Sequence, residues 1–355
     1  MDRRTLTKIG LASFALSGLV LPSMAAEDLK LKYSDRPDVK AFIQDVSKRR
    51  ALDPEWVAEV INSATYQPKI ERLMTPKKPK PGTKSLMRDW DRYRDMFLGS
   101  YRINLGAEFW KNNKDLLDRA HREFGVDPAV IVGIIGVETR YGENTGSWKI
   151  LDALVTLSFD YRRRSDFFKK ELEEFLVFLQ QNGLHHLQVQ GSYAGAIGMP
   201  QFMPSSIKRF GVDYDGDGKV DLSNSVADTI GSVANYLAKN GWQEGQPMIL
   251  DAYISPKNAV TYGSGKTARF ELGKLLDAGV KLRDPNLVVD PKTKVFVVDL
   301  PFYPSNSTTT DHIYKLGTKN FATVLRYNSQ YFYATAVAEL ASAIALKLGE
   351  QGLIS

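Results

Sequence analysis

The stretch from Asp127 to Gly142, DPAVIVGIIGVETRYG, constrains the fold most strongly. Asp127 is a favourable helix N-cap, and Pro128 suits the first helical position because no hydrogen bond is lost there. The residues from Val130 to Val137 are almost wholly apolar. A helix that is apolar on every side belongs inside a protein, so we predict a helix buried nearly all round.

Glu138 is the only ionisable residue in the apolar stripe that Ile131, Ile134 and Ile135 form at helical spacing. Burial disfavours a charged carboxylate, so we expect the pKa of Glu138 to rise. A carboxylic acid that stays protonated near neutral pH can serve as a general acid. From spacing alone, the alternative is a helix-end glutamate that turns to solvent or pairs with Arg140.

The N-terminal residues 1–26 resemble an export signal. They combine a basic start, an apolar run from Ile9 to Leu21 that is short for a membrane span, and small residues up to Ala26. Arg3 and Arg4 also loosely match a twin-arginine signal. We therefore predict a protein exported to the periplasm by a cleavable signal, with an uncleaved N-terminal anchor as the alternative.

The chain has no cysteine among its 355 residues. This excludes a lipid-modified cysteine after the signal, a disulfide framework and thiol catalysis. We expect a soluble exported protein that is not a lipoprotein. The formal net charge of +6 suits an anionic polymer, although nucleic acid or a membrane surface would suit it too.

The hydrophobic pattern divides the mature chain into regions of different character. We expect an N-terminal helical subdomain over 27–125, with two of its helices over 87–104 and 107–124. A core follows over 126–245. It includes a loop of small residues, GSYAGAIGMPQFMPSS at 191–206, in which backbone can approach a ligand closely.

Strand and turn signals then dominate residues 246–320. Apolar runs separated by glycine, proline and Asp-Pro breaks predict a small, mostly antiparallel β-subdomain inserted into a helical protein. The expected strands cover 248–250, 259–262, 287–289 and 295–300. Residues 321–355 return to a helical pattern and would complete the core.

An acidic loop at residues 213–221 matches the first part of an EF-hand calcium loop. Aspartates occupy loop positions 1, 3, 5 and 9, glycine occupies position 6, and a lysine offers its backbone carbonyl at position 7. Position 12 is Asn224 where an EF-hand has glutamate, so Asp228 is the expected substitute within the loop region 213–228. The predicted ligands of a structural calcium ion are Asp213, Asp215, Asp217, Lys219, Asp221 and Asp228. The alternative is a set of Asx-turns that binds no metal well.

Five collinear motifs closely resemble the lytic murein transglycosylase B family over nearly the whole mature chain. They are GVETRYG at 136–142, the stretch ILDALVTLSFDYRRRSDFFKKELEEFL at 150–176, the small-residue loop at 191–206, DTIGSVANYLAKNGW at 228–242, and RYNSQYFYA at 326–334. The resemblance implies an α+β, mainly helical fold. It would have a lysozyme-like core with an additional helical subdomain and a small antiparallel β-subdomain.

The resemblance also implies a reaction. The family cleaves the β-1,4 bond between N-acetylmuramic acid and N-acetylglucosamine in peptidoglycan and leaves a 1,6-anhydromuramoyl product. Glu138 would act as acid and then as base, and Glu143 is the next candidate. No organic cofactor is implied. The alternatives are a hydrolytic muramidase and a non-catalytic peptidoglycan-binding protein.

The family's sugar-contacting residues carry over onto matching motif positions. They are Tyr93, Phe167, Ser192, Gln201, Tyr236, Tyr327, Asn328 and Tyr333. Some relatives have tyrosine where this chain has Phe167, and most have proline where it has Arg162. The implied partners are peptidoglycan glycan strands, with cell-wall synthesis proteins as further candidates and no nucleic acid. We expect a monomer.

Overall fold

The computed structural model describes residues 32–76, 85–263 and 265–352. The predicted export signal at 1–26 lies outside these residues. The first described helices are η1 (Tyr33–Asp35), α1 (Pro37–Arg50), α2 (Pro54–Asn62) and α3 (Pro68–Met74).

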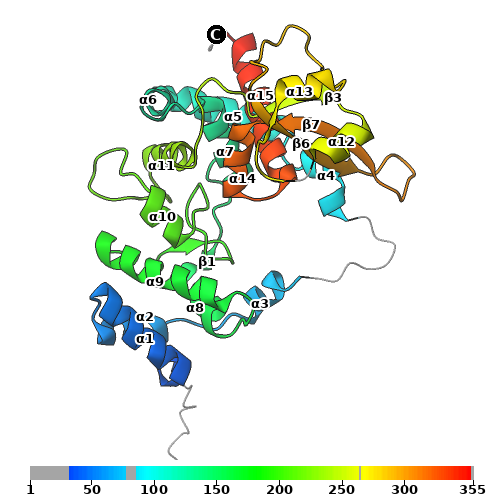
Figure 1. Cartoon of the computed structure of the whole chain (residues 1–355). Helices are drawn as coiled ribbons and strands as arrows, with labels where there is room; N and C mark the ends of the chain where they lie inside the picture. The colour runs from blue at the N-terminus through cyan, green and yellow to red at the C-terminus, as the bar shows by residue number, and fades with distance from the viewer. Residues whose placement is uncertain (1–31, 77–84, 264, 353–355) are drawn as a thin grey trace, which may run out of the picture.

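These first helices pack against α8 (Ile150–Phe159) and α9 (Ser165–Asn182), as Figure 1 shows. Tyr33 donates a hydrogen bond of 2.7 Å to Asp160, and the Arg49 guanidinium lies 2.6 Å from the Glu173 carboxylate. The N-terminal helices therefore cover one side of a helix pair that comes about a hundred residues later in the chain.

The next helices lie on the other side of the molecule (Figure 1), and they differ from the prediction. Instead of two helices over 87–104 and 107–124, the chain forms η2 (Leu86–Arg88), α4 (Trp90–Asp95), α5 (Ser100–Asn112) and α6 (Lys114–Phe124). Gly99 is extended and begins α5, while Asn113 leaves helical geometry and separates α5 from α6. Glycine and asparagine disfavour helix interiors, which explains both breaks.

The predicted apolar helix is α7 (Pro128–Thr139). The Asp127 side chain accepts a hydrogen bond of 2.8 Å from the backbone N–H of Ala129, which confirms the expected N-cap. Residues 129–137 are all buried. They pack against α5, α6, α11 (Val226–Lys239) and α15 (Tyr331–Glu350). This helix lies at the centre of the core, as its composition predicted.

The contact between α7 and α15 is unusually close at Gly133. A Cβ atom there would lie 2.9 Å from the backbone oxygen of Val337, so only glycine fits without a shift. Among the described residues, α15 alone is long and apolar enough to span a membrane, but most of it is buried inside the protein. Its composition is therefore that of a core helix.

A five-stranded antiparallel sheet covers part of α4 and α15, in the strand order β4-β6-β7-β3-β5. The strands are β3 (Ile249–Tyr253), β4 (Phe270–Glu271), β5 (Lys281–Leu282), β6 (Lys294–Phe302) and β7 (Asp311–Gly317). Alternate residues of β6 face opposite sides: Phe296 and Val298 join the main core, while Val295 and Val297 join a smaller one. Helices α12 (Pro256–Tyr262) and α13 (Leu272–Asp277) cover the second face.

Two of the four predicted strands are wrong. Residues 259–262 lie in α12, and residues 287–289 form no strand. The Ser255 hydroxyl accepts a hydrogen bond from the N–H of Asn258 and Pro256 occupies the first helical position, so this segment starts as a capped helix. Strand β7 was missed, and it pairs with β6 and β3 at the centre of the sheet.

The remaining elements surround the loop of small residues. Strands β1 (Trp148–Lys149) and β2 (Gln190–Gly191) form a short antiparallel pair, and α10 (Pro204–Phe210) follows the loop. Helix α14 (Lys319–Tyr327) leads from the sheet back to α15. The start of α15 thereby reaches the end of α7, where Tyr333 contacts Glu138.

Candidate active site

Glu138 lies in the last turn of α7 and is partly accessible to solvent, although the residues before it are buried. The Tyr333 hydroxyl, from α15, donates a hydrogen bond of 2.6 Å to its Oε1 atom. Burial raises the pKa of Glu138 to about 7, and the Tyr333 hydrogen bond opposes this because it favours the carboxylate. This carboxyl group can hold or release a proton near neutral pH, as the sequence predicted.

Three tyrosines pack in a row that begins at Tyr333, the residue that binds Glu138. The Tyr333 ring is stacked on Tyr327 at 6.3 Å between centroids, and Tyr327 meets the edge of Tyr236 at 4.9 Å. Burial raises the pKa of Tyr327 and of Tyr333 well above the usual value, and the charge of Glu138 adds to this. Both hydroxyl groups therefore stay protonated and act as hydrogen-bond donors.

Tyr93 of α4 completes this cluster from another direction. Burial raises its pKa, and the charge of Glu138 is the second cause, which places the two groups near each other. Its ring contacts Phe332, the residue before Tyr333, at 5.4 Å between centroids. Three of the four predicted sugar-site tyrosines thus lie around the carboxyl group, and the fourth, Tyr236, packs behind Tyr327.

Residues 197–202, which we call the Met199 loop, border this cluster. Thr139 donates a hydrogen bond of 2.8 Å to the backbone carbonyl of Met199, and the Tyr327 hydroxyl donates to the carbonyl of Pro200. Gly198 has φ of 73°, and a Cβ atom there would lie 2.2 Å from the carbonyl oxygen of Leu222. Only glycine allows this approach, which agrees with the predicted role of the small residues.

Gln201 follows in the same loop with a positive φ of 51°. Its side-chain nitrogen donates to the backbone carbonyls of Thr145 at 3.0 Å and Gly198 at 2.9 Å. Both neighbours are acceptors, so the amide has one possible orientation. Its Oε1 atom remains to accept a hydrogen bond from a ligand hydroxyl or N–H group.

A cavity of about 450 Å³ opens beside this loop. Gln201, Tyr236 and Tyr327 line it together with two basic residues, Arg209 and Arg326. Aromatic faces with polar groups at their edges suit the alternating C–H and O–H surface of a sugar. The arginines and Phe202, which also contact or line the site, were not found from the sequence because single arginines and phenylalanines carry no spacing signal.

The other predicted sugar-site residues lie further out. Ser192 accepts a hydrogen bond of 3.0 Å from the N–H of Ala196, and exposed Asn328 ends α14 beside Tyr327. Phe167 of α9 contacts Phe168 and the Arg164 guanidinium. No contact within the described residues links these three side chains to Glu138. Their role in sugar binding stays a prediction.

Glu143, the other candidate for the catalytic acid, has a different environment. It is exposed, and its carboxylate accepts a hydrogen bond of 2.8 Å from Tyr101 and lies 3.4 Å from the Arg140 guanidinium. This carboxylate thus faces solvent, Tyr101 and Arg140, and within the described residues it has no hydrogen bond to the tyrosines around Glu138. The geometry therefore favours Glu138 for proton transfer.

The acidic loop gathers three of its predicted ligands. Carboxylate oxygens of Asp213, Asp215 and Asp217 lie within 4.8 Å of one another. Gly216 and Gly218 adopt the positive φ values of 80° and 90° that a tightly curled loop needs. Three converging carboxylates in such a loop fit a hard cation such as calcium.

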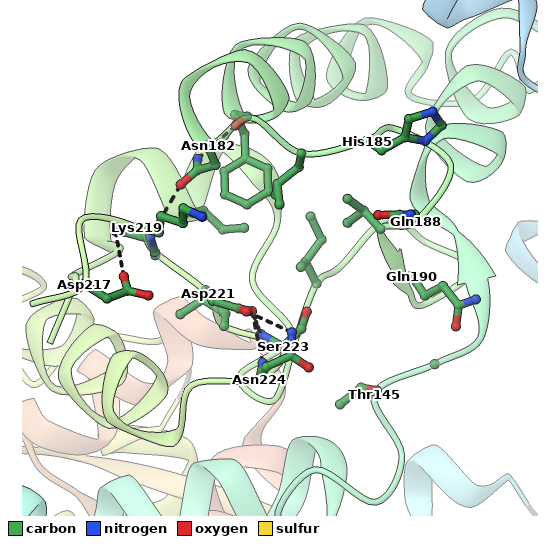
Figure 2. A pocket seen from close by; sticks show the side chains of 18 residues that line it. Thr145, Asn182, His185, Gln188, Gln190, Asp217, Lys219, Asp221, Ser223 and Asn224 are labelled. Atoms are coloured by element: carbon green, nitrogen blue, oxygen red, sulfur yellow. Dashed lines mark hydrogen bonds between the residues drawn. The ribbon is translucent and has the colours of Figure 1, made fainter. Parts of the chain in front are cut away.

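Asp221 and Lys219 lie beside this cluster and line a second cavity, of about 520 Å³ (Figure 2). Asp221 accepts hydrogen bonds from the N–H groups of Ser223 and Asn224. Figure 2 shows Gln188 and Gln190 on the opposite side of this cavity.

Asp228 has a different position from the one predicted. It is buried in α11, where its two oxygens accept hydrogen bonds of 2.7 Å from the backbone N–H groups of Tyr214 and Asp221. The structure therefore places it as a link between the two ends of the acidic loop rather than within the carboxylate cluster. The Asp228 carboxylate thereby supplies acceptors for two backbone N–H groups of the acidic loop, which would otherwise lack partners.

The mainly helical fold, with a buried carboxyl group beside tyrosines and an aromatic-lined cavity, fits the class of enzymes that cleave polysaccharide chains. The family model of the transglycosylase SLT domain matches residues 34–342. Over 320 residues the chain is 36% identical to the membrane-bound lytic murein transglycosylase B of Escherichia coli (strain K12), covering 88% of this chain and 84% of that protein.

Two solved structures are also similar. The soluble lytic transglycosylase SltB1 from Pseudomonas aeruginosa has a TM-score of 0.77 and 36% identity, covering 88% of this chain and 100% of that chain. The Escherichia coli lytic transglycosylase Slt35 in complex with calcium has a TM-score of 0.76 and 35% identity, covering 89% and 95%. The chain therefore belongs to the lytic transglycosylase family with an SLT domain and has its lysozyme-like fold.

Proposed function

We propose that this enzyme cleaves the β-1,4 bond between N-acetylmuramic acid and N-acetylglucosamine in peptidoglycan, with Glu138 as the acid and then the base. The observation that carries this proposal is the Glu138 carboxyl group. Its pKa is about 7, and one of its oxygens accepts a hydrogen bond from Tyr333. Near neutral pH a substantial fraction of this group is protonated, which a general acid requires.

The reaction needs two proton transfers. Protonated Glu138 gives its proton to the glycosidic oxygen, and the bond from that oxygen to C1 of the muramic acid breaks. The resulting carboxylate takes a proton from the 6-hydroxyl of the same sugar, whose oxygen bonds to C1. The products are a free 4-hydroxyl and a 1,6-anhydro ring, and no water is consumed.

Tyr333 fixes the geometry of these transfers. Because its hydroxyl binds Oε1 of Glu138, the Oε2 atom is left to exchange the proton with the substrate. The same hydrogen bond stabilises the carboxylate that forms after the first transfer. Tyr333 therefore assists both proton transfers of Glu138.

A hydrolytic muramidase would usually need a second carboxylate to activate water or to trap the sugar. Glu143 is exposed and engaged with Tyr101 and Arg140, which does not suit either role. A non-catalytic binding protein would have no need for a carboxyl group with a raised pKa. A muramidase would give hydrolysed products, and a binding protein would give none.

The products test this proposal directly. Purified peptidoglycan sacculi would be incubated with the protein, and the released muropeptides weighed by mass spectrometry. We expect anhydro products, which lack the added water of a hydrolysed end. Reducing ends with one added water would indicate a muramidase, and no release of fragments would indicate a binding protein.

We further propose that Asp213, Asp215 and Asp217 hold a structural calcium ion. The support is their clustering and the calcium in the Slt35 structure. We also propose that residues 1–26 export the chain to the periplasm, where peptidoglycan is accessible. Since the chain has no cysteine, a cysteine-linked lipid would not anchor it.

A further inference from the structure

Thr139, the buried residue immediately after the glutamate, makes two hydrogen bonds through its hydroxyl group. Its side chain is 1% exposed, and its hydroxyl donates to the carbonyl of Met199 at 2.8 Å and accepts from the N–H of Gly142 at 3.1 Å. The carbonyl of Ile135 is 3.4 Å away, so the single hydroxyl hydrogen is better placed toward Met199. Thr139 thus ties the end of α7 to the Met199 loop.

The same loop is held from its other side. Tyr327 donates a hydrogen bond to the carbonyl of Pro200, the residue after Met199, and its ring stacks on Tyr333. Tyr333 in turn binds Glu138. The contacts therefore form a closed ring that begins at Glu138, passes through two tyrosines and the loop, and ends at Thr139.

We propose that Thr139 is a positioning residue that holds the Met199 loop against the catalytic helix. This inference rests on the proposed function. With the loop in place, the Gln201 amide keeps its Oε1 atom free for the substrate and the tyrosines stay packed beside Glu138. Without the Thr139 hydroxyl, the Met199 carbonyl and the Gly142 N–H lose their partners and the loop can move away.

Displacement of the loop would have an effect on Glu138 itself. The ionisable groups that face this carboxyl group are Tyr93 of α4, Tyr327 of α14 and Tyr333 of α15. All three are neutral near pH 7, so burial is the cause that raises the pKa of Glu138. Water that enters beside a displaced loop would weaken this effect of burial.

The test compares Thr139→Val, which keeps the shape but removes the hydroxyl, with Thr139→Ser, which keeps it. A matched control is Thr156→Val, because Thr156 is equally buried in α8 and its hydroxyl accepts a hydrogen bond of 3.1 Å from the N–H of Gln67. This control removes one buried threonine hydroxyl that has no contact with the Met199 loop.

We expect kcat/KM of Thr139→Val on peptidoglycan to fall about tenfold or more, and Thr139→Ser to stay within about threefold of the parent, as fits the loss of buried hydrogen bonds. The alkaline limb of the pH–rate profile should move to lower pH in Thr139→Val only. Thr156→Val should lower the melting temperature by a similar amount without moving this limb. Equal kcat/KM and equal pH limbs in Thr139→Val and Thr156→Val would overturn the proposal.

Two further measurements keep the test decisive. Glu138→Gln with Thr139→Val should bind a muropeptide fragment more weakly than Glu138→Gln alone, which needs no turnover. If Thr139→Val does not fold, Tyr327→Phe, which releases the other side of the loop, should shift the pH limb in the same direction; an unchanged limb would overturn the proposal. If the proposed function itself were wrong, the parent protein would release no anhydro products. This result differs from every outcome that tests Thr139.

Discussion

The carboxyl groups of this enzyme stand in two contrasting environments. In the acidic loop, Asp213 accepts hydrogen bonds from the backbone N–H groups of Gly216, Asp217 and Gly218, and its neighbours are exposed. At the end of α7, Glu138 has Tyr333 as its hydrogen-bond donor and lies beside buried rings. The first carboxylate is surrounded by backbone N–H groups and solvent, whereas burial raises the pKa of the second.

This difference separates two functions that the amino-acid types alone do not distinguish. A carboxylate that already carries charge and lies close to others can bind a cation. A carboxyl group that resists ionisation can deliver a proton. Asp228 represents a third case, because it is fully buried and its two oxygens accept hydrogen bonds from backbone N–H groups, so it serves the fold.

The largest expected effect is the difference in activity between substitutions of Glu138 and of the exposed Glu143. Glu138→Gln should keep the fold and lose activity by a factor on the order of 10² to 10⁴, because an amide can neither give nor take the proton. Glu143→Gln is the matched control and should stay near the parent rate. Initial rates of fragment release from sacculi would measure both, and an active Glu138→Gln would move the chemistry to another residue.

Asp228 should affect stability whether or not calcium is present. Asp228→Ala removes the acceptor of two backbone N–H groups, so the free energy of unfolding should fall by about 2–3 kcal/mol. Urea unfolding with and without a chelator would measure this loss. A loss that occurs only in the presence of calcium would make Asp228 a metal ligand after all.

Calcium should stabilise the parent protein through the acidic loop. A ligand bound only by the folded state at about 100 times its Kd adds about 2.7 kcal/mol. Thermal melts with excess calcium and with a chelator should therefore differ by several degrees. Asp215→Ala combined with Asp217→Ala should remove the difference, and a parent protein that melts alike in both buffers would show that the loop is a set of Asx-turns.

The smallest expected effect is a shift in the pH–rate profile when the Tyr333 hydroxyl is removed. Its hydrogen bond favours the Glu138 carboxylate and so lowers a pKa that burial raises to about 7. Tyr333→Phe removes this donor, so the pKa should rise and the alkaline limb of the pH–rate profile should move upward by up to about one unit. A downward shift would mean that burial of Glu138 depends on the Tyr333 hydroxyl.

The sequence predicted those elements whose signals lie close together in the chain. Asp127 and Pro128 start α7 as expected, and the apolar run of that helix is buried. Gly198 shows the close backbone approach that small residues permit. Ser255 and Pro256 form a helix-capping pattern of the same local kind. This pattern begins a helix where a strand was expected.

Other features could not be predicted from local pattern because they depend on distant segments. Tyr333 lies 195 positions from Glu138, and Met199 lies 60 positions from Thr139. Such pairs are formed by packing, which has no period in the sequence. The family resemblance pointed to Tyr333 as a sugar-site residue, but it assigned no role to Thr139 or Arg326, although both lie in its motifs, and none to Arg209.

The sequence by itself determined the buried glutamate helix, the curled acidic loop and the motifs of the family, because helix caps, periodicity and glycine geometry act between neighbours. Only the tertiary structure decided the burial and the hydrogen-bond partners of each carboxyl group. The pKa of Glu138 rises because the packing of other elements against the end of α7 buries this carboxyl group, and the Tyr333 hydrogen bond limits the rise. Asp228 became an internal acceptor because the loop folds back onto α11. Desolvation depends on everything that surrounds a group, and that is fixed only when the whole chain has packed.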